Sequence, residues 1–273
     1  MSANAAAPAP VAINSVYNWR DLSNAADNTS DIIKPGVLYR SAKLCNKKNG
    51  KSAPSAADLA KLSRALAGGV VIDLRDHNKT GSWGSCKDEK SLKKLKGVSF
   101  VSRPAIGKAS GSGYILAFVG KNLTKAEKAA EAKQKPRTRL TYKQTRVNLG
   151  KAITDIANAD GPVVFHCAAG KDRTGWIATM VYFVMGADKS TILKAYTNSN
   201  KHLPNGERVK KEWLTSALSQ VNKNFSKKHT AGWPSRSTVL KYLKAKATNG
   251  KGSGLGVSQA AIDKLIVKLK PVR

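Results

Sequence analysis

The sequence predicts an α/β protein with a largely parallel central sheet flanked by helices. Two short, largely apolar runs rich in β-branched residues, 70–74 and 163–165, are typical of strands that are covered on both faces. Each run is preceded by a segment whose apolar residues recur at helical spacing, and turn residues separate the two. We expect a single domain over residues 12–273, preceded by a flexible Ala/Pro arm at 1–11.

The first helix–strand pair begins at Ser55, which can cap a helix. Leucines recur there at helical spacing as far as Leu66, and two glycines end the helix before the strand at 70–74. The second pair has the same order. Apolar residues at helical spacing over 149–156 are followed by an Asp-Gly-Pro break and by the strand at 163–165.

The C-terminal half is expected to be mainly helical. Residues 176–185 are apolar almost all round, which is typical of a central buried helix. Apolar stripes predict two further core helices, one around 209–221 and one over 258–269 that Ser258 caps.

A polar, Lys-rich stretch at 119–146 has helical propensity but is too charged to lie in the core. One interpretation is a solvated surface helix. The other is a mobile basic lid over an anion-binding site. The cations that such a lid would present are Lys133, Lys135, Arg137, Arg139, Lys143 and Arg146.

The chain is strongly basic, with 48 Lys and Arg against 17 Asp and Glu and a net charge of +31. Such a field attracts polyanions, so anionic lipid surfaces, polyphosphorylated small molecules, wall polymers and nucleic acid are candidate partners. The alternative is a surface charge that serves solubility. A composition of 41% apolar and 24% charged residues excludes wholesale disorder and fibrous classes. No apolar run of about 18 residues occurs, so a transmembrane helix is not expected.

Three cysteines give an odd count. Cys45 and Cys86 can pair in an oxidising compartment, which leaves Cys167 as a single reactive thiol; alternatively, Cys45 and Cys86 are both unpaired. The small residues and prolines at the start are typical of a mature N-terminus left by secretory cleavage. Export is therefore one hypothesis, and a cytoplasmic location is the other.

The segment at 166–175, His-Cys-Ala-Ala-Gly-Lys-Asp-Arg-Thr-Gly, lies between the second strand and the buried helix. In open α/β sheets, ligands bind beyond the carboxyl ends of strands, and a helix that begins there directs its free N–H groups at an anion. A helix N-terminus and a nearby cation lower a cysteine pKa to ~3.5–7.5. Cys167 is therefore expected to be a nucleophile near neutral pH.

Arg173 follows Cys167 after five residues, which lets the backbone curl into a cradle of N–H donors that the guanidinium closes. Arginine suits this place because its planar fork can hold two phosphoryl oxygens at once. Gly170 permits unusual dihedrals in the curl, and Thr174 can donate its hydroxyl to the cysteine sulfur. The expected phosphate-binding residues are Ala168, Ala169, Gly170, Lys171 and Arg173.

Cysteine, five residues, arginine and threonine together resemble the signature of the protein tyrosine phosphatase superfamily. The form HCAAGKDRTG resembles its bacterial subgroup of tyrosine and phosphoinositide phosphatases. The blocks at 18–22, 37–41, 72–75 and 196–200 resemble those of the family in the same order, so the match covers most of the chain. The resemblance implies a protein-tyrosine-phosphatase-like fold and double displacement through a phosphocysteine, with no cofactor and no metal.

The leaving group also needs a proton, which many members of the superfamily supply from an aspartate on a loop upstream of the cysteine. Between residues 98 and 166 the only carboxylates are Glu127, Glu131, Asp155 and Asp160. The first two lie in the Lys-rich stretch, and the other two lie near the end of a helix that faces the wrong strand terminus. Asp172 is therefore expected to be the general acid, a role that the resemblance also implies. The alternative is a structural carboxylate that braces the loop.

Lys171 adds a second cation beside Arg173, which a multiply phosphorylated ring can use; the alternative is a solvated lysine. His166 is expected to orient the thiolate from behind, with a satisfied core histidine as the alternative. Five charged residues are expected to brace the loop rather than to contact substrate. They are Arg20, Asp21, Arg40, Asp73 and Arg75.

We therefore expect a phosphomonoesterase that acts on phosphoinositides and also on phosphotyrosine peptides. Peripheral contact with an anionic membrane is expected, and nucleic acid is not an expected partner. Two alternatives remain: a phytase-like inositol polyphosphate phosphatase, or an inactive basic phosphate-loop module that holds anionic membrane or nucleic acid.

Overall fold

The computed structural model describes residues 10–23, 29, 31–48, 53–76, 92, 95, 97–106, 114–120, 124–126, 129 and 140–271. At its centre lies a five-stranded sheet in the order β1-β2-β5-β3-β4. The strands are β1 (Arg20–Asp21), β2 (Leu38–Ser41), β3 (Val70–Asp73), β4 (Ser99–Ser102) and β5 (Val163–His166). The edge strand β1 pairs antiparallel with β2, and the other strands pair in parallel. The predicted α/β class and largely parallel sheet are confirmed.

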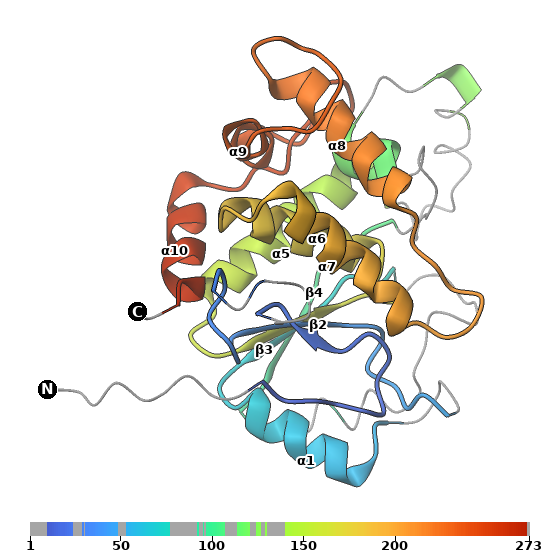
Figure 1. Cartoon of the computed structure of the whole chain (residues 1–273), viewed down its shortest axis with the longest axis vertical. Coiled ribbons are helices and arrows are strands. Elements are labelled where there is room, and N and C mark those ends of the chain that lie inside the picture. Colours follow the sequence, from blue (N-terminus) through green and yellow to red (C-terminus); the bar gives the residue numbers. More distant parts are fainter. Residues whose placement is uncertain are drawn as a thin grey trace, which may run out of the picture.

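Helices cover both faces of the sheet. On one side lies α1 (Ala56–Ala65), and the remaining helices lie on the other side (Figure 1). These are η2 (Ile115–Val119, a π-helix), α5 (Tyr142–Asn158), α6 (Arg173–Val184), α7 (Lys189–Thr197), η4 (Asn198–Lys201, a 3₁₀-helix), α8 (Lys211–Phe225), α9 (Arg236–Lys244) and α10 (Gln259–Leu269). None of the described helices combines the length and apolar composition needed to cross a bilayer.

The two faces of the sheet follow from the alternation of side chains along each strand. Tyr39, Val71 and Val164 lie side by side in register, and all three belong to the core cluster on the α1 side. Their chain neighbours Ile72 and Phe165 point the other way, into the larger cluster beneath α5 and α6. Because β5 is buried on both faces, its end is a fixed platform for the segment that follows.

The helix boundaries agree with the capping residues expected from the sequence. Ser55 accepts a hydrogen bond from the N–H of Asp58 (3.2 Å), and Ser258 accepts one from Ala261 (3.1 Å). The central helix is α6, in which residues 174–184 are all buried. It begins at Arg173 and therefore starts directly at the end of the Cys167 loop.

The structure describes the two ends of the stretch at 119–146 and only a few residues between them. Val119 ends the buried η2, and Thr141 caps α5, which begins one residue later. Of the expected lid cations, Lys143 is exposed on α5, whereas Lys133, Lys135, Arg137 and Arg139 lie outside the described residues.

Arg146 was wrongly placed among the expected lid cations, because it is only 1% exposed. It donates to Ser253 Oγ (2.8 Å) and to the carbonyl oxygen of Thr248 (2.6 Å). A charge count along the sequence cannot distinguish a solvated cation from one that satisfies the polar groups of a distant loop. Arg146 therefore anchors the 248–253 loop and does not face an anionic substrate.

Two predictions concern the N-terminal part. Residues 1–9 of the expected arm lie outside the described part of the chain. The carbonyl of Val11 accepts a hydrogen bond from Trp19 Nε1 (2.7 Å), so the folded body includes Val11. Cys45 is engaged in a disulfide. Its expected partner, Cys86, lies outside the described residues.

Candidate active site

The loop that joins β5 to α6, residues 167–172, lies at the carboxyl end of the central strand. The ends of β2 and β3 flank it, since Ser41 and Asp73 are both in register with His166. Because α6 starts at Arg173, the free N–H groups of its first turn lie at the same place. The sequence motif therefore lies where a parallel sheet and a helix N-terminus both favour an anion.

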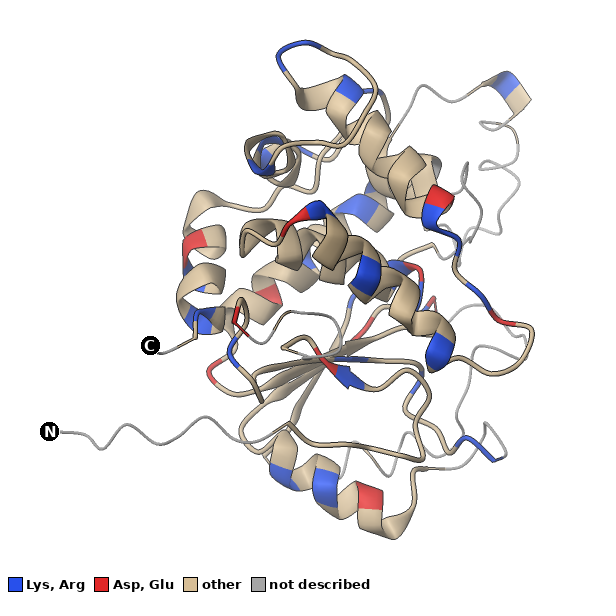
Figure 2. Ribbon diagram, viewed as in Figure 1, with Lys and Arg blue, Asp and Glu red and all other residues tan. Residues whose placement is uncertain are grey.

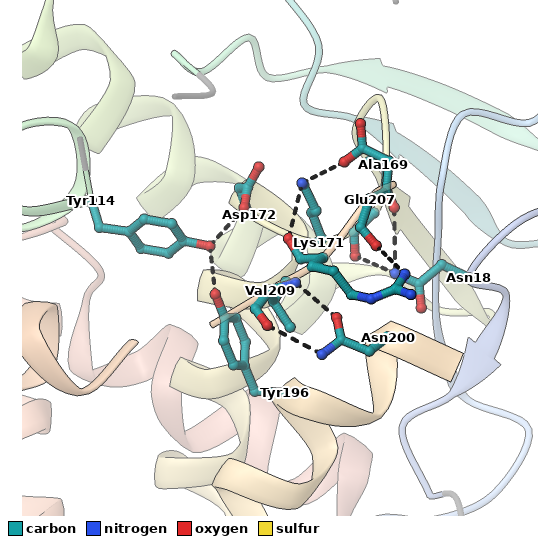
Figure 3. Close-up of polar contacts among 11 residues, drawn as sticks. Asn18, Tyr114, Ala169, Lys171, Asp172, Tyr196, Asn200, Glu207 and Val209 are labelled. Atoms are coloured by element: carbon teal, nitrogen blue, oxygen red, sulfur yellow. Dashed lines mark hydrogen bonds and ion pairs between the residues drawn. The ribbon is translucent and has the colours of Figure 1, made fainter. Parts of the chain in front are cut away.

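Donors from the β2 side hold the carbonyl groups of this loop. The N–H of Lys43 donates to Ala168 O (3.0 Å). Arg40 Nη2 donates to Gly170 O (2.6 Å), and Asn18 Nδ2 donates to the same oxygen (2.9 Å) and to Ala169 O (3.3 Å; Figure 3). With its carbonyls held from outside, the loop can direct its N–H groups inward, as an anion cradle requires.

Gly170 is the residue that lets the loop turn this tightly. Its φ is 67°, in the left-handed region. A Cβ atom at this position would lie 2.4 Å from the carbonyl oxygen of Ser41, which is backbone and cannot move aside. The expected role of Gly170 is confirmed by both the dihedral and the close approach.

Arg173 is anchored through one nitrogen. Nη1 donates to Leu74 O and to Ala105 O, both at 3.1 Å. Nε is buried and has no hydrogen-bond partner among the described residues. The carbonyls at the ends of β3 and beyond β4 therefore orient the guanidinium and leave its Nε edge available for an anionic oxygen.

Cys167 is a free thiol at the base of the loop, 1% exposed. Burial by itself raises the pKa of this thiol, but the Arg173 guanidinium and hydrogen bonds from the side chain and N–H of Thr174 outweigh burial. The pKa of Cys167 therefore lies below its ordinary value, although the charge of Asp172 opposes the shift. The Thr174 hydroxyl is buried and has no nitrogen or oxygen partner among the described residues, so it is available to the sulfur.

Asp172 is 9% exposed, and its carboxyl accepts a hydrogen bond from one tyrosine, whose hydroxyl contacts a second. The hydroxyl of Tyr114 donates to Asp172 Oδ1 (2.9 Å) and lies 3.0 Å from the hydroxyl of Tyr196 on α7 (Figure 3). Burial raises the pKa of Asp172, while Lys171, Tyr114 and Arg173 oppose the rise. The net direction is upward, which favours the protonated carboxyl that a general acid needs.

Lys171 is neither solvated nor free. Its Nζ lies 2.5 Å from Glu207 Oε2 and donates to the carbonyl oxygen of Arg208 (3.2 Å; Figure 3). The alternative of a solvated lysine is therefore wrong. The positive charge of Lys171 is paired with the carboxylate of Glu207, a residue that the sequence analysis did not identify.

Arg20 and Arg40 lie opposite each other in the antiparallel pair of β1 and β2, and both donate to Ser199 Oγ (2.8 and 3.4 Å). Arg40 braces the loop directly through Gly170 O, and Arg20 is linked to Arg40 through the shared acceptor Ser199. Asp21 does not brace the loop, which corrects the prediction. It follows Arg20 along the strand and so faces the opposite side, where its carboxylate accepts hydrogen bonds from N–H groups between β1 and β2 (2.7 and 2.8 Å).

Asp73 and Arg75 form an ion pair (Nη2 to Oδ2, 2.6 Å) on either side of Leu74, whose carbonyl holds Arg173. His166 Nδ1 lies 3.5 Å from the carbonyl oxygen of Cys167 and 3.9 Å from Asp73 Oδ1. These three side chains therefore support the backbone around the site. Within the described residues, no group of three or more His, Cys, Asp or Glu could hold a metal ion.

Tyr114, Tyr196, Glu207 and Asn18 are the functional residues that the sequence did not identify. Asn18 and Tyr196 lie in blocks that resemble the family, which was an available signal. Tyr114 and Glu207 reach the loop from 58 and 36 residues away along the chain, and no local pattern marks them.

A family model and curated relatives that match this chain are all described as phosphatases. A model described as "Tyrosine phosphatase family" matches residues 11–268. The triple specificity protein phosphatase PtpB of Mycobacterium tuberculosis is 41% identical over 56 residues, which are 20% of each chain. A tyrosine-protein phosphatase of Nostoc commune is 31% identical over 121 residues, 41% of this chain and 40% of that one. The matches thus span less than half the length of these curated relatives.

Among solved structures, the core catalytic domain of the PP-IP phosphatase SIW14 from S. cerevisiae covers 68% of this chain and 84% of its own. Its identity is 14% and its TM-score is 0.38, a likeness too weak to support a conclusion.

Proposed function

Since the chain belongs to the tyrosine phosphatase family, we propose that it is a cysteine-dependent phosphomonoesterase in which Cys167 attacks phosphorus and Arg173 holds the phosphoryl group. The family match confirms the resemblance seen in the sequence blocks. The preferred substrates in this proposal are phosphoinositides, and phosphotyrosine peptides are also cleaved.

One observation carries the proposal more than any other. The guanidinium of Arg173 uses Nη1 for two backbone carbonyls and keeps a buried, unpartnered Nε at the loop that begins with Cys167. A buried polar group without a partner is costly unless a ligand satisfies it. A phosphoryl oxygen supplies the acceptor that Nε lacks, and the lowered pKa of Cys167 supplies the thiolate nucleophile.

In the first step, the thiolate of Cys167 attacks phosphorus, an S–P bond forms, and the bond to the leaving oxygen breaks. The N–H groups of the loop and Arg173 stabilise the equatorial oxygens in the transition state. Asp172, whose raised pKa favours the protonated form, gives its proton to the leaving oxygen.

In the second step, water attacks the phosphocysteine and inorganic phosphate leaves. Asp172 is now a carboxylate and accepts the proton of the attacking water. The departing sulfur recovers its negative charge beside Thr174, whose hydroxyl stabilises the thiolate. The site then returns to its starting protonation state.

The charge of the protein supports an anionic substrate with more than one phosphate. The net charge is +31, and Lys and Arg are spread over helices on both sides of the sheet (Figure 2). Lys171 places a second cation two residues before Arg173 in the sequence. Peripheral contact with an anionic membrane belongs to the proposal, since basic residues near a surface are attracted to anionic lipids.

We also propose that the protein works in an oxidising compartment. The disulfide at Cys45 supports export, because disulfides are rare in cytosolic proteins.

The proposal is tested by phosphate release from phosphoinositide vesicles, phosphotyrosine peptides and phytate, for the wild type and for Cys167→Ser. The wild type is expected to act fastest on phosphoinositides, and Cys167→Ser is expected to release no phosphate from any of them. Rates should fall as ionic strength rises, since the attraction is screened. Equal release by both proteins would contradict the proposal. Tight binding of vesicles by both, without release by either, would favour the inactive module.

A further inference from the structure

The ion pair between Lys171 and Glu207 joins the Cys167 loop to the segment 201–211. The side chain of Lys171 is 11% exposed and that of Glu207 is 23% exposed, so water reaches the pair mainly from the Glu207 side. Lys171 also donates to the carbonyl oxygen of Arg208, which keeps its ammonium on the Glu207 side. The second cation of the site is thus occupied by the protein itself.

Glu207 is the only carboxylate in the segment 201–211, which otherwise carries Lys201, Arg208, Lys210 and Lys211. Its backbone is fixed by a turn, in which its N–H donates to Pro204 O (3.1 Å). The side chain of Asn200 makes two hydrogen bonds to the backbone of Val209 (2.7 and 3.1 Å; Figure 3). The segment therefore presents one negative charge to the loop from an anchored position.

We propose that Glu207 substitutes for a second phosphate: its carboxylate occupies Lys171 in the free protein, and a substrate with a phosphate next to the hydrolysed one displaces it. The carboxylate and the phosphate compete because both offer anionic oxygens to the same ammonium. Glu207 is then a residue that determines specificity. The inference rests on the proposed function for its substrate class. Within that class, it assigns to Glu207 the selection between substrates with one phosphate and substrates with two neighbouring phosphates.

A ligand with one phosphate uses Arg173 and the N–H groups of the loop, and it leaves the Lys171–Glu207 pair intact. A ligand with two neighbouring phosphates gains Lys171 only after Glu207 has been released. Its apparent affinity is therefore reduced by the fraction of molecules in which Lys171 is free. Removing the charge of Glu207 removes this penalty for the second class of ligand and leaves the first class almost unchanged.

The test measures binding by calorimetry in the Cys167→Ser protein, with an inositol monophosphate and a vicinal inositol bisphosphate as probes. Glu207→Gln is expected to tighten binding of the bisphosphate about tenfold and to change that of the monophosphate less than about twofold. The matched control is Glu212→Gln, which removes the same charge from the exposed first turn of α8. The control is expected to change neither affinity more than about twofold.

A double substitution isolates the pair. With Lys171→Met in place, adding Glu207→Gln is expected to leave the bisphosphate affinity unchanged. Lys171→Gln replaces Lys171→Met if the latter lacks a cooperative melting transition. Equal gains for both ligands, the same gain with Glu212→Gln, or a gain that persists without Lys171 would each overturn the proposal. Because this test measures binding, it examines the role of Glu207 even if the protein never releases phosphate. If the protein is active but Glu207→Gln leaves the ratio of bisphosphate to monophosphate affinity unchanged, the role of Glu207 is refuted and the proposed function is not.

Discussion

Asp172 and Lys171 are neighbours in one loop, but the protein holds their side chains in two different ways. Asp172 is held from the core by Tyr114, which is 0% exposed and is itself in contact with Tyr196. Lys171 is as buried as Asp172, at 9% exposed, but its partner Glu207 is 23% exposed and comes from a loop without regular structure. The proposed proton donor is therefore held by the core of the fold, whereas the second cation is paired with the group that we propose a ligand displaces.

The difference has a physical basis. A buried hydrogen bond is costly to break, because the partner left behind loses about 1–3 kcal/mol of solvation. Glu207 is partly exposed, so water can solvate its carboxylate when it leaves Lys171, and an anionic ligand can then satisfy the ammonium. In this account one loop combines a rigid catalytic group, Asp172, with a recognition group, Lys171, whose partner is exchangeable. The following variants test this division.

The largest effect is expected from Asp172→Asn, which removes the proton donor and keeps the shape of the side chain. On substrates with poor leaving groups, such as phosphoinositides, kcat should fall about 10²- to 10⁴-fold. On an activated aryl phosphate it should fall little, because that leaving group departs without a proton. Steady-state measurement of kcat on both substrates distinguishes a proton donor from a structural carboxylate. Equal losses would assign Asp172 to bracing the loop instead.

A smaller effect is expected from Tyr114→Phe. Burial raises the pKa of Asp172 and the hydrogen bond from Tyr114 opposes the rise, so removing the hydroxyl should raise this pKa further. The general acid works when protonated, and activity is lost as pH rises through its pKa. The descending limb of the kcat–pH profile should therefore move to higher pH, with kcat reduced up to about tenfold.

Glu207→Gln provides the opposite control for Tyr114→Phe. The charge of Glu207 is among the groups that raise the pKa of Asp172, after burial, so its removal should lower this pKa. The same descending limb should then move to lower pH, by less than in Tyr114→Phe because Glu207 lies nearer to water. If the descending limb moved in the same direction in Tyr114→Phe and in Glu207→Gln, the contacts of Tyr114 and of Glu207 with the loop would not be independent.

The central part of this molecule could be predicted from its sequence because the signals are local. The strands β3 and β5 are short apolar runs, α1 and α10 carry serine caps, and the motif from Cys167 to Arg173 is contiguous. Asp21 was misplaced because it adjoins Arg20 in the sequence, although adjacent residues of a strand face opposite sides.

The remaining contacts could not be predicted, because they join distant parts of the chain. Arg146 reaches Ser253 across 107 residues, and a basic side chain in a basic stretch gives no sign of burial. Glu207 is likewise one acid in a Lys-rich segment, and only the folded chain brings it to Lys171.

The most direct measurement is the pH dependence of the alkylation of Cys167 by iodoacetamide, followed by the mass of the peptide that contains it. Burial opposes ionisation, but Arg173 and Thr174 outweigh it, so the midpoint should lie below the ~8.5 of an ordinary thiol. Arg173→Gln should move the midpoint upward, because the guanidinium charge is lost. A midpoint at or above ~8.5 that Arg173→Gln leaves unchanged would contradict a thiolate nucleophile at this site.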